Sequence, residues 1–389
     1  MSAYRKVNLT LLVTLFAAQS AVIAMSPVLA EAATDLNVST AAAGQLRTIT
    51  GLAAGITALL LGTVAGRIRL RSQLLGASAL LGLGSLASAA APGYTLLAVA
   101  QLPVGVAVAV LTTAGTLAAA EWVPEELRTR TLSWALVGQP AAWIVGMPLL
   151  GVVGTHSWRY GWLALPFLAA ALAGVLLARN GSAGSLAAPA QPERGVLRDQ
   201  GIGSWIASEL FANAAWAGTL VYAGALFAEV HGTSTSATGV LLALAAAAYV
   251  AGNLASRHLV SHEPRRLLVW LAATLAVADL AFLAADCGTA MRTILFSAAA
   301  LLAGSRTLVS SAYAISMPAE RRAAATSLRA ATMQFGYFLG SSAGGAALAA
   351  GGYRTVGLVM ASLFLAAATA LLPKRRTVAR PAAGASGAC

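Results

Sequence analysis

The sequence predicts an all-α integral membrane protein in which twelve transmembrane helices form two six-helix halves. Composition is the first observation behind this prediction: 58% of the 389 residues are hydrophobic and only 10% are charged, whereas about a quarter of the residues in a soluble domain are charged. A series of long apolar stretches and a weak internal repeat are the second and third observations. This composition excludes a soluble globular protein.

Apolar stretches long enough to cross a bilayer recur along the whole chain. A helix needs roughly 20 apolar residues to cross a hydrocarbon core about 30 Å thick. Hydropathy, turn residues and charges place such spans at 8–30, 43–65, 72–90, 94–119, 131–153, 160–178, 203–228, 237–257, 266–285, 292–317, 323–349 and 353–372. No room remains for a separate soluble domain. The first span is long for a secretory signal, so we expect it to stay uncleaved.

Lys and Arg residues concentrate on one side of the predicted membrane. With the N-terminus in the cytoplasm, most of the 25 Lys and Arg residues lie in cytoplasmic segments, and the outer segments hold only Arg47, Arg159, Arg292 and Arg354. Cytoplasmic loops of membrane proteins carry such an excess. We therefore expect a multi-pass protein of the plasma (inner) membrane with both termini cytoplasmic. The net charge of +12 then reflects topology, and no nucleic-acid partner is expected.

The longest polar connection divides the spans into two groups of six. Residues 179–202 are rich in Gly, Ser, Ala and Pro and predict a flexible cytoplasmic linker. It separates an N-terminal bundle, residues 1–178, from a C-terminal bundle, residues 203–372. The tail, residues 373–389, has no periodic apolar pattern, and we expect it to be disordered.

Short motifs repeat between the two groups of spans. The sequence GTVAGR at 62–67 recurs as GNLASR at 252–257, with Gly, Ala and Arg in register. A second motif, PEELR at 124–128, recurs as PAERR at 318–322. Two halves with repeated signatures are typical of secondary transporters, in which the binding site lies between the repeats.

Glycine and proline are concentrated in two places. The loop after span two reads GTVAGRIRLR over 62–71, and span five holds GQP at 138–140 and GMPLLG at 146–151. Glycine permits close helix approach in lipid, and neighbouring helices re-satisfy carbonyl groups freed by proline. These residues either bend a helix that moves or merely pack helices together. The candidates for a conformational role are Gly62, Arg67, Arg71, Gly138, Pro140, Gly146, Pro148 and Gly151.

Over residues 8–372 these motifs resemble those of the major facilitator superfamily, and within it the twelve-span drug:proton antiporters and related bacterial metabolite exporters. The resemblance implies the major facilitator fold, a central cavity open to one side at a time, and a monomer. Two positions depart from the family pattern. Gly66 replaces an Asp that is implied to latch the outward-open state, and Gln101 replaces an Arg that is implied to tune a nearby acid.

Ionisable residues within spans are costly and are functional candidates by default. Glu209, Asp279, Arg306 and Arg329 are the candidates of this kind. Glu209 and Arg329 both lie about 10 Å from the cytoplasmic end of their spans by helical rise, so they could meet. One hypothesis makes Glu209 the protonatable group, with Arg329 or Arg306 keeping it ionised; the alternative is a permanent structural ion pair. Arg306 either recognises the substrate or has a structural partner, and Asp279 is expected to have a local role.

Uncharged polar and aromatic residues in the spans complete the candidate site. They include Gln19, Gln101, Trp143, Asn213, Trp216, Tyr313 and Gln334, with Tyr222 and Tyr337 among further candidates. An apolar, aromatic pocket with a few polar groups suits an amphipathic organic molecule of drug size. Against this, a single aromatic residue on a span is more often packed or in contact with lipid.

The expected function is export of a small amphipathic molecule, such as an antibiotic or secondary metabolite, by proton antiport. A sugar, nucleoside or amino-acid-type transporter of the same fold is the alternative, and a substrate-sensing receptor is a third. We expect no enzyme activity and no metal, because all four histidines fall in loops and His258-x-x-x-His262 lacks the Glu of a zinc-protease helix. The expected partners are the substrate and the lipid bilayer, with the proton gradient in place of a cofactor.

Overall fold

The computed structural model describes residues 3–64, 68–180, 200–258, 263–317 and 319–372, and every regular element within them is helical. The first half contains α1 (Ala3–Ile23), α2 (Leu29–Asp35), α3 (Thr40–Val64), α4 (Leu70–Ala90), α5 (Tyr94–Glu121), α6 (Glu125–Ala141), α7 (Met147–Gly154), α8 (Trp158–Trp162) and α9 (Leu168–Asn180). The second half contains α10 (Gln200–His231), α11 (Thr235–Ala255), α12 (Pro264–Ala284), α13 (Thr289–Ile315) and α14 (Ala319–Ala370). The predicted all-α class is confirmed.

Eleven helical stretches in the described residues are long and apolar enough to cross a membrane, and the last of them comprises two spans. That stretch, Leu328–Ala370, has 43 residues and would measure about 65 Å as one straight helix, roughly twice the thickness of a hydrocarbon core. The helix breaks at Gly351 and Gly352, and Gly352 has a φ of 70°. Glycine adopts this left-handed conformation without steric cost. The described residues therefore make the twelve predicted crossings.

Three spans differ from regular helices. Span one, predicted over 8–30, ends as a helix at Ile23, and a turn leads into the short α2. Spans five and six each contain a π-helical segment, η2 (Ala142–Gly146) and η3 (Leu163–Phe167). Pro140 lies just before η2 and Pro166 lies within η3. Because proline removes one helix hydrogen bond and its ring displaces a carbonyl group, the backbone widens locally at both places.

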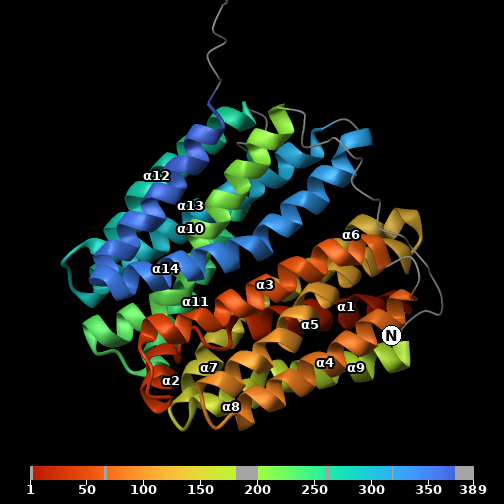
Figure 1. Ribbon diagram of the computed structural model, residues 1–389. Coiled ribbons are helices and arrows are strands. Elements are labelled where there is room, and N and C mark those ends of the chain that lie inside the picture. The colour runs from red at the N-terminus through yellow and green to blue at the C-terminus, as the bar shows by residue number, and fades with distance from the viewer. Residues whose placement is uncertain (1–2, 65–67, 181–199, 259–262, 318, 373–389) are drawn as a thin grey trace, which may run out of the picture.

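The helices form two bundles that meet at one end of the molecule. In Figure 1 the first half, α1 to α9, lies below the second half, α10 to α14. The halves contact each other through α3 on α14, α7 on α11 and α2 on α10. They diverge toward the end where the N-terminus lies (Figure 1). We call the opposite end, where α2 lies, the α2 end.

Glycine lets the two halves approach closely at the α2 end. A Cβ atom on Gly151 of α7 would lie 2.8 Å from the carbonyl oxygen of Thr235 and 3.1 Å from the Cα of Gly239, both on α11. A Cβ on Gly224 of α10 would lie 1.9 Å from the carbonyl oxygen of Ser26, in the turn after α1. Small residues at such crossings are typical of packed membrane helices.

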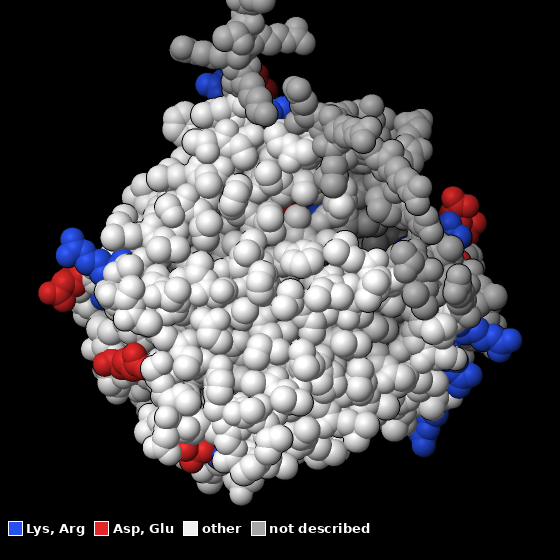
Figure 2. Space-filling view, in the orientation of Figure 1, with Lys and Arg blue, Asp and Glu red and all other residues white. Residues whose placement is uncertain are grey.

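The surface has the polarity expected of a membrane-spanning protein. Figure 2 shows charged side chains gathered at the ends of the molecule, with a broad uncharged band between them. Large apolar side chains are exposed on the spans, among them Leu83, Val145, Trp270, Val277 and Ile294. Exposed apolar area of this extent is rare on a soluble monomer and here provides the surface that contacts lipid.

Candidate functional site

A buried cluster of one carboxylate and two guanidinium groups joins three helices of the second half. Glu209 on α10 has a side chain only 1% exposed. Its Oε1 lies 2.8 Å from Nη1 of Arg306 on α13, and its Oε2 lies 3.0 Å from Nε of Arg329 on α14. The two residues that the sequence places at similar depth, Glu209 and Arg329, are thus in direct contact. We call these three residues the ion cluster.

Neighbouring polar groups hold the two arginines in place. Nη2 of Arg306 donates to the carbonyl and hydroxyl oxygens of Ser208, at 3.3 and 3.1 Å. Nη2 of Arg329 donates to the carbonyl oxygen of Thr307, at 3.3 Å. Buried ion pairs are retained only where such additional hydrogen bonds offset the loss of hydration. The ion cluster carries two positive charges and one negative charge, so one positive charge is in excess.

Aromatic side chains lie beside the ion cluster, toward the middle of the membrane. Tyr249 of α11 donates a hydrogen bond from its hydroxyl to Oγ1 of Thr307, at 2.8 Å. Trp216 of α10 stacks on Tyr249 and on Phe296, with ring centroids 6.3 and 6.2 Å apart. Trp216 is also near the midpoint of the 32-residue α10. Transporters built from repeated halves bind their substrates at this depth.

The other predicted residues of the second half lie on the same three helices. Asn213 of α10 donates from Nδ2 to Oγ1 of Thr332 on α14, at 3.1 Å. Gln334 is half-buried on α14. Tyr313 packs edge-on against Trp205, with centroids 5.7 Å apart, on the α13 turns that follow Arg306. The fold therefore brings the predicted residues of α10, α13 and α14 together around the ion cluster.

The predicted residues of the first half do not join this group. Gln101 of α5 is buried and bridges three helices: it accepts from Thr50 on α3, at 3.2 Å, and donates to Ser88 on α4, at 3.1 Å. Its position is that of a packing residue within the first half. Gln19 on α1 and Trp143 in η2 are half-buried, and neither has a side-chain hydrogen bond to another described residue.

The conformational candidates lie at helix contacts and helix ends. A Cβ on Gly138 would lie 2.2 Å from the carbonyl oxygen of Leu12 on α1, and one on Gly146 would meet side chains of Leu165 and Ile23. Pro148 is in the first turn of α7, which Gly151 packs against α11. Arg71 donates from Nε to the carbonyl oxygen of Leu177, at 3.2 Å, near the end of α9. Gly62 is in the last turns of α3, whereas Arg67 lies outside the described residues.

Asp279, the remaining predicted acid, lies apart from the ion cluster. It is fully buried on α12, and its Oδ2 accepts from Thr219 of α10, at 2.8 Å. Its place agrees with the local role expected for it.

Two of the arginines counted in the outer segments, Arg47 and Arg292, are buried in the structure. Arg292 lies in the first turn of α13 and donates to the carbonyl oxygens of Phe282 and Ala285. Arg47 lies within the predicted span 43–65 and two turns inside α3, which begins at Thr40, and it is 7% exposed. Its guanidinium carbon lies 4.5 Å from the ring centroid of Tyr337 on α14, in the other half. The signal that could have found it is the apolar sequence on both sides of the arginine.

Polar contacts join the halves at the α2 end. Thr235 of α11 donates to Oε2 of Glu31 on α2, at 3.1 Å. Glu229, near the end of α10, accepts from Thr40 of the first half and, at 2.7 Å, from Tyr353 of the second. The two halves are therefore closed against each other at this end.

A third acid, Asp35, helps to tie three segments of the first half together at the α2 end. Arg159 forms an ion pair with Asp35 and donates from Nη2 to the carbonyl oxygen of Ala91, at 3.1 Å. Trp158 donates from Nε1 to Oδ2 of Asp35, at 3.0 Å, and the guanidinium stacks on its ring. The Trp-Arg pair that opens span six thus fixes α2 and α8 against each other.

Asp35→Asn is expected to destabilise the protein at neutral pH but not in acid. The Arg159 guanidinium, and then the Trp158 indole, hold the pKa of Asp35 below its ordinary value of 3.8. The folded state thus binds a proton at the Asp35 carboxylate less tightly than the unfolded state does. The contribution of this carboxylate to the free energy of unfolding is therefore complete above about pH 4, and it is lost as the pH falls through the depressed pKa. Since the carboxylate is half exposed, we expect its contribution to the free energy of unfolding to be at most about 1 kcal/mol. Thermal unfolding of both proteins from about pH 7 to about pH 3 checks this; a difference that persists unchanged in acid contradicts it.

Comparisons with known proteins agree with this architecture. The chain matches the model of the Major Facilitator Superfamily over residues 10–317 and 210–387. Similar solved structures include a D-xylose-proton symporter, with 16% identity, a TM-score of 0.75 and coverage of 95% of this chain and 97% of that one. A nucleoside transporter, NupG, has 14% identity, a TM-score of 0.74 and coverage of 94% and 98%.

A bacterial homologue of the human lysosomal transporter Spinster, in an inward-facing and unoccupied conformation, has 13% identity, a TM-score of 0.73 and coverage of 95% of both chains. At such identities these likenesses show the shared fold alone. No curated protein matches the sequence.

Proposed function

Because the chain belongs to the Major Facilitator Superfamily and is a transporter, not an enzyme, we propose that it exports a small amphipathic molecule, such as an antibiotic or secondary metabolite, by proton antiport. This assigns it to the drug:proton antiporter and metabolite exporter group of the superfamily. The ion cluster is the observation that carries the proposal. It places one carboxylate, Glu209, at the contact of three helices of the second half.

Glu209 is the proton carrier in this proposal. When ionised, it holds α10, α13 and α14 together through Arg306 and Arg329. A proton bound to the carboxylate removes the charge that both guanidinium groups face, and the three helices are then free to separate. Loss of the proton restores both ion pairs. A group whose protonation changes helix contacts in this way couples proton movement to a change of conformation.

The aromatic surroundings favour an amphipathic substrate. Trp216, Tyr249 and Phe296 form a stacked apolar face beside the ion cluster. Asn213 and Gln334 add polar groups on α10 and α14. Ligand sites in proteins combine apolar and aromatic walls with a few polar groups that orient the ligand.

The orientation proposed for the chain decides which side of the membrane the closed end faces. We place the protein in the plasma (inner) membrane as a monomer with both termini cytoplasmic, which makes the α2 end the outer end. Closure there by Glu31 and Glu229, with the halves diverging toward the other end (Figure 1), fits an exporter that takes up its substrate from the cytoplasm. The proton gradient supplies the energy, with no cofactor.

Transport of a sugar, nucleoside or amino-acid-type metabolite is the second candidate. The similar structures favour it, since they include a D-xylose-proton symporter and a nucleoside transporter. The polar groups of Asn213, Tyr313 and Gln334 are of the kind that hydrogen bond to hydroxyl groups. The first candidate function predicts that amphipathic compounds drive proton movement, and the second predicts that sugars, nucleosides or amino-acid-type metabolites do so.

Proton movement in everted membrane vesicles tests the proposal. A dye reports the pH gradient while amphipathic antibiotics, sugars and nucleosides are added one at a time. We expect an amphipathic compound to dissipate the gradient, and Glu209→Gln to abolish this response. Asp279→Asn is the matched control, because it removes a buried carboxylate of the same half outside the ion cluster, and it should retain the response.

Substrate counterflow separates a coupling defect from misfolding, because exchange of labelled for unlabelled substrate needs no proton gradient. Glu209→Gln should retain counterflow. Undiminished proton movement in Glu209→Gln would show that another group carries the proton. A response to sugars or nucleosides alone would favour the second candidate.

A further inference from the structure

Arg47 is a buried cation outside the ion cluster, and no described carboxylate forms an ion pair with it. Its Nε and Nη1 atoms are buried and have no hydrogen-bond acceptor among the described residues. Arginine stays charged in proteins, so its burial cannot be relieved by loss of a proton. The face of Tyr337 attracts the guanidinium but accepts no hydrogen bond in its plane. An acceptor with negative charge is therefore missing.

The described spans contain no acid that could fill this role. Glu209 already faces Arg306 and Arg329, and Asp279 accepts from Thr219. Glu229, near the end of α10, accepts from Thr40 and Tyr353. Around the middle of the protein, the charges of the ion cluster and Arg47 sum to two positive charges in excess. In a medium of low dielectric constant, such an excess favours an anionic ligand and opposes a cationic one.

The place of Arg47 suits a ligand that also reaches the ion cluster. Thr40, which closes the α2 end, lies seven residues before Arg47 on α3, or about 10 Å by helical rise. On the other side, Tyr337 and Arg329 are separated by eight residues of α14, or about 12 Å. Tyr249 lies between them and bonds to Thr307, whose carbonyl oxygen receives Arg329. Arg47 thus lies at a depth between the closed α2 end and the ion cluster.

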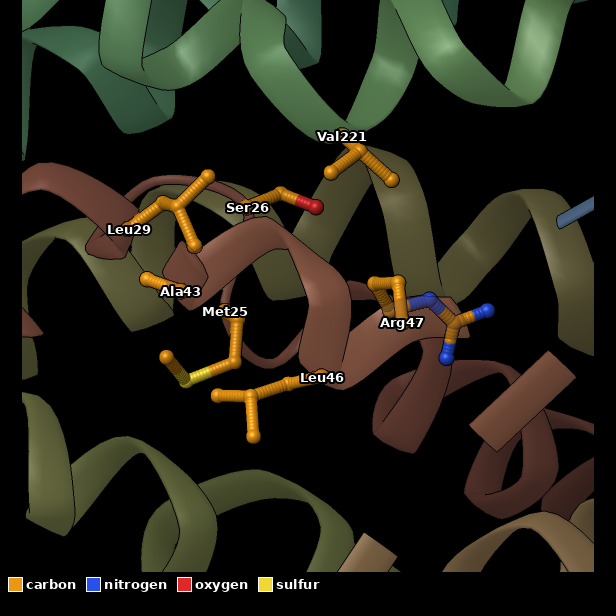
Figure 3. A pocket seen from close by; sticks show the side chains of 7 residues that line it. All are labelled: Met25, Ser26, Leu29, Ala43, Leu46, Arg47 and Val221. Carbon is orange, nitrogen blue, oxygen red and sulfur yellow. The ribbon is translucent and has the colours of Figure 1, made fainter. Parts of the chain in front are cut away.

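The guanidinium points away from the small pocket beside it (Figure 3). Figure 3 shows the stem of Arg47 along a pocket that Met25, Ser26 and Val221 also line, while its charged end turns away from these side chains. The pocket has a volume of about 10 Å³, space for about one water molecule. The small pocket therefore does not hold the ligand, and the guanidinium lies at the boundary between the halves, against Tyr337.

We propose that Arg47, held against Tyr337 at the boundary between α3 and α14, binds a carboxylate of the transported molecule, so that the substrates are amphipathic organic anions. A guanidinium and a carboxylate form charge-assisted hydrogen bonds with well-defined geometry. The inference rests on the proposed transport function and names the substrate class. It assigns Arg47 to the substrate and leaves Arg306 to the ion cluster.

Matched pairs of probes isolate the charge from the rest of the ligand. The pairs are 4-phenylbutyrate with 4-phenylbutyramide, indole-3-butyrate with indole-3-butyramide, and 2-naphthoxyacetate with 2-naphthoxyacetamide, and tetraphenylphosphonium serves as a cationic probe. Binding to the full-length protein in lipid nanodiscs is measured by calorimetry at one pH, without a gradient. We expect at least one carboxylate to bind about 10- to 100-fold more tightly than its amide.

Substitutions at Arg47 test whether this residue causes the preference for a carboxylate over its amide. Arg47→Gln should bring the carboxylate-to-amide ratio close to one while leaving the affinity for the amide within about threefold. Arg47→Lys keeps the charge and should retain part of the preference, which shows that a loss in Arg47→Gln is not misfolding. Tyr337→Phe keeps the ring under the guanidinium and should keep the ratio.

Three results would overturn the inference. They are tighter binding of tetraphenylphosphonium than of every carboxylate, no preference for any carboxylate in the wild-type protein, and an unchanged preference in Arg47→Gln. Failure of the proposed antiport is recognised separately. If Arg47→Gln loses the preference but no compound moves protons in vesicles, the anion site stands and antiport is wrong. If only neutral or cationic compounds move protons, antiport stands and the anion site is wrong.

Discussion

Glu209→Gln is expected to lower the free energy of unfolding by about 3–5 kcal/mol, because removing one member of a buried ion pair leaves its partners as uncompensated charges. Here both Arg306 and Arg329 lose the carboxylate that they face at 2.8 and 3.0 Å. Their guanidinium groups then repel each other inside the second half. Thermal unfolding of the purified protein in detergent, followed by tryptophan fluorescence, measures the loss of stability.

A double substitution and an exposed glutamate serve as controls for this result. Adding Arg329→Gln to Glu209→Gln removes one of the two uncompensated charges, so the double variant should be more stable than the sum of the two single effects implies. Glu126→Gln changes an exposed glutamate in the first turn of α6 and should cost less than about 1 kcal/mol. Equal stability of Glu209→Gln and the wild-type protein would mean that water or another charge compensates the arginines.

Gly224→Val is expected to force the α2 end open and to stop transport. Its Cβ would lie 1.9 Å from the carbonyl oxygen of Ser26, so either α10 or the turn after α1 has to move. These two segments belong to different halves, and the closed contacts of Glu31 and Glu229 lie at the same end. The steric conflict therefore favours the conformation in which the halves separate there.

Cysteine labelling measures this opening. Val221→Cys, with Cys287 and Cys389 changed to serine, places a thiol at a position that is 5% exposed in the closed state and faces the small pocket of Figure 3. A membrane-impermeant maleimide should label it about tenfold faster or more when Gly224→Val is present, since overpacking of one to three kcal/mol shifts the equilibrium by about that factor.

Gly252→Val is the matched control for Gly224→Val. A Cβ on Gly252 would also lie 1.9 Å from a carbonyl oxygen, that of Leu301, but both residues belong to the second half. It should destabilise the packing of α11 on α13 without exposing position 221. Equally fast labelling in Gly252→Val and Gly224→Val would indicate general loosening, and labelling at the wild-type rate in Gly224→Val would show that the α2 end stays closed.

Properties that depend on short stretches of sequence were predictable. The twelve crossings follow from local hydropathy, because a bilayer requires about 20 apolar residues per span wherever the helix packs. The boundary between the last two spans was also predictable, since it falls at the pair Gly351 and Gly352. The contact of Glu209 with Arg329 was a reasonable inference from depth, because unpaired charges in spans are costly.

Properties that depend on helix rotation and on contacts between distant spans were not predictable. The sequence does not show that Arg47 of α3 packs against Tyr337 of α14 in the other half. The sequence predicts that Gln101 lines the cavity, whereas in the structure its side chain hydrogen bonds to Thr50 and Ser88 within the first half. A shift of one residue turns a helical side chain by about 100°, so span boundaries known to a few residues do not determine what a side chain faces.

The sequence by itself determined that this chain is a membrane protein of two repeated halves and which charged residues lie deep in its second half, because hydropathy and charge act locally and each buried ion has to find a partner. Only the tertiary structure decided that Glu209 faces two arginines at once and that Arg47 faces none of the acids. It also decided that the halves are closed at the α2 end. These features are relations between helices far apart in sequence, and the packing of side chains against one another sets them.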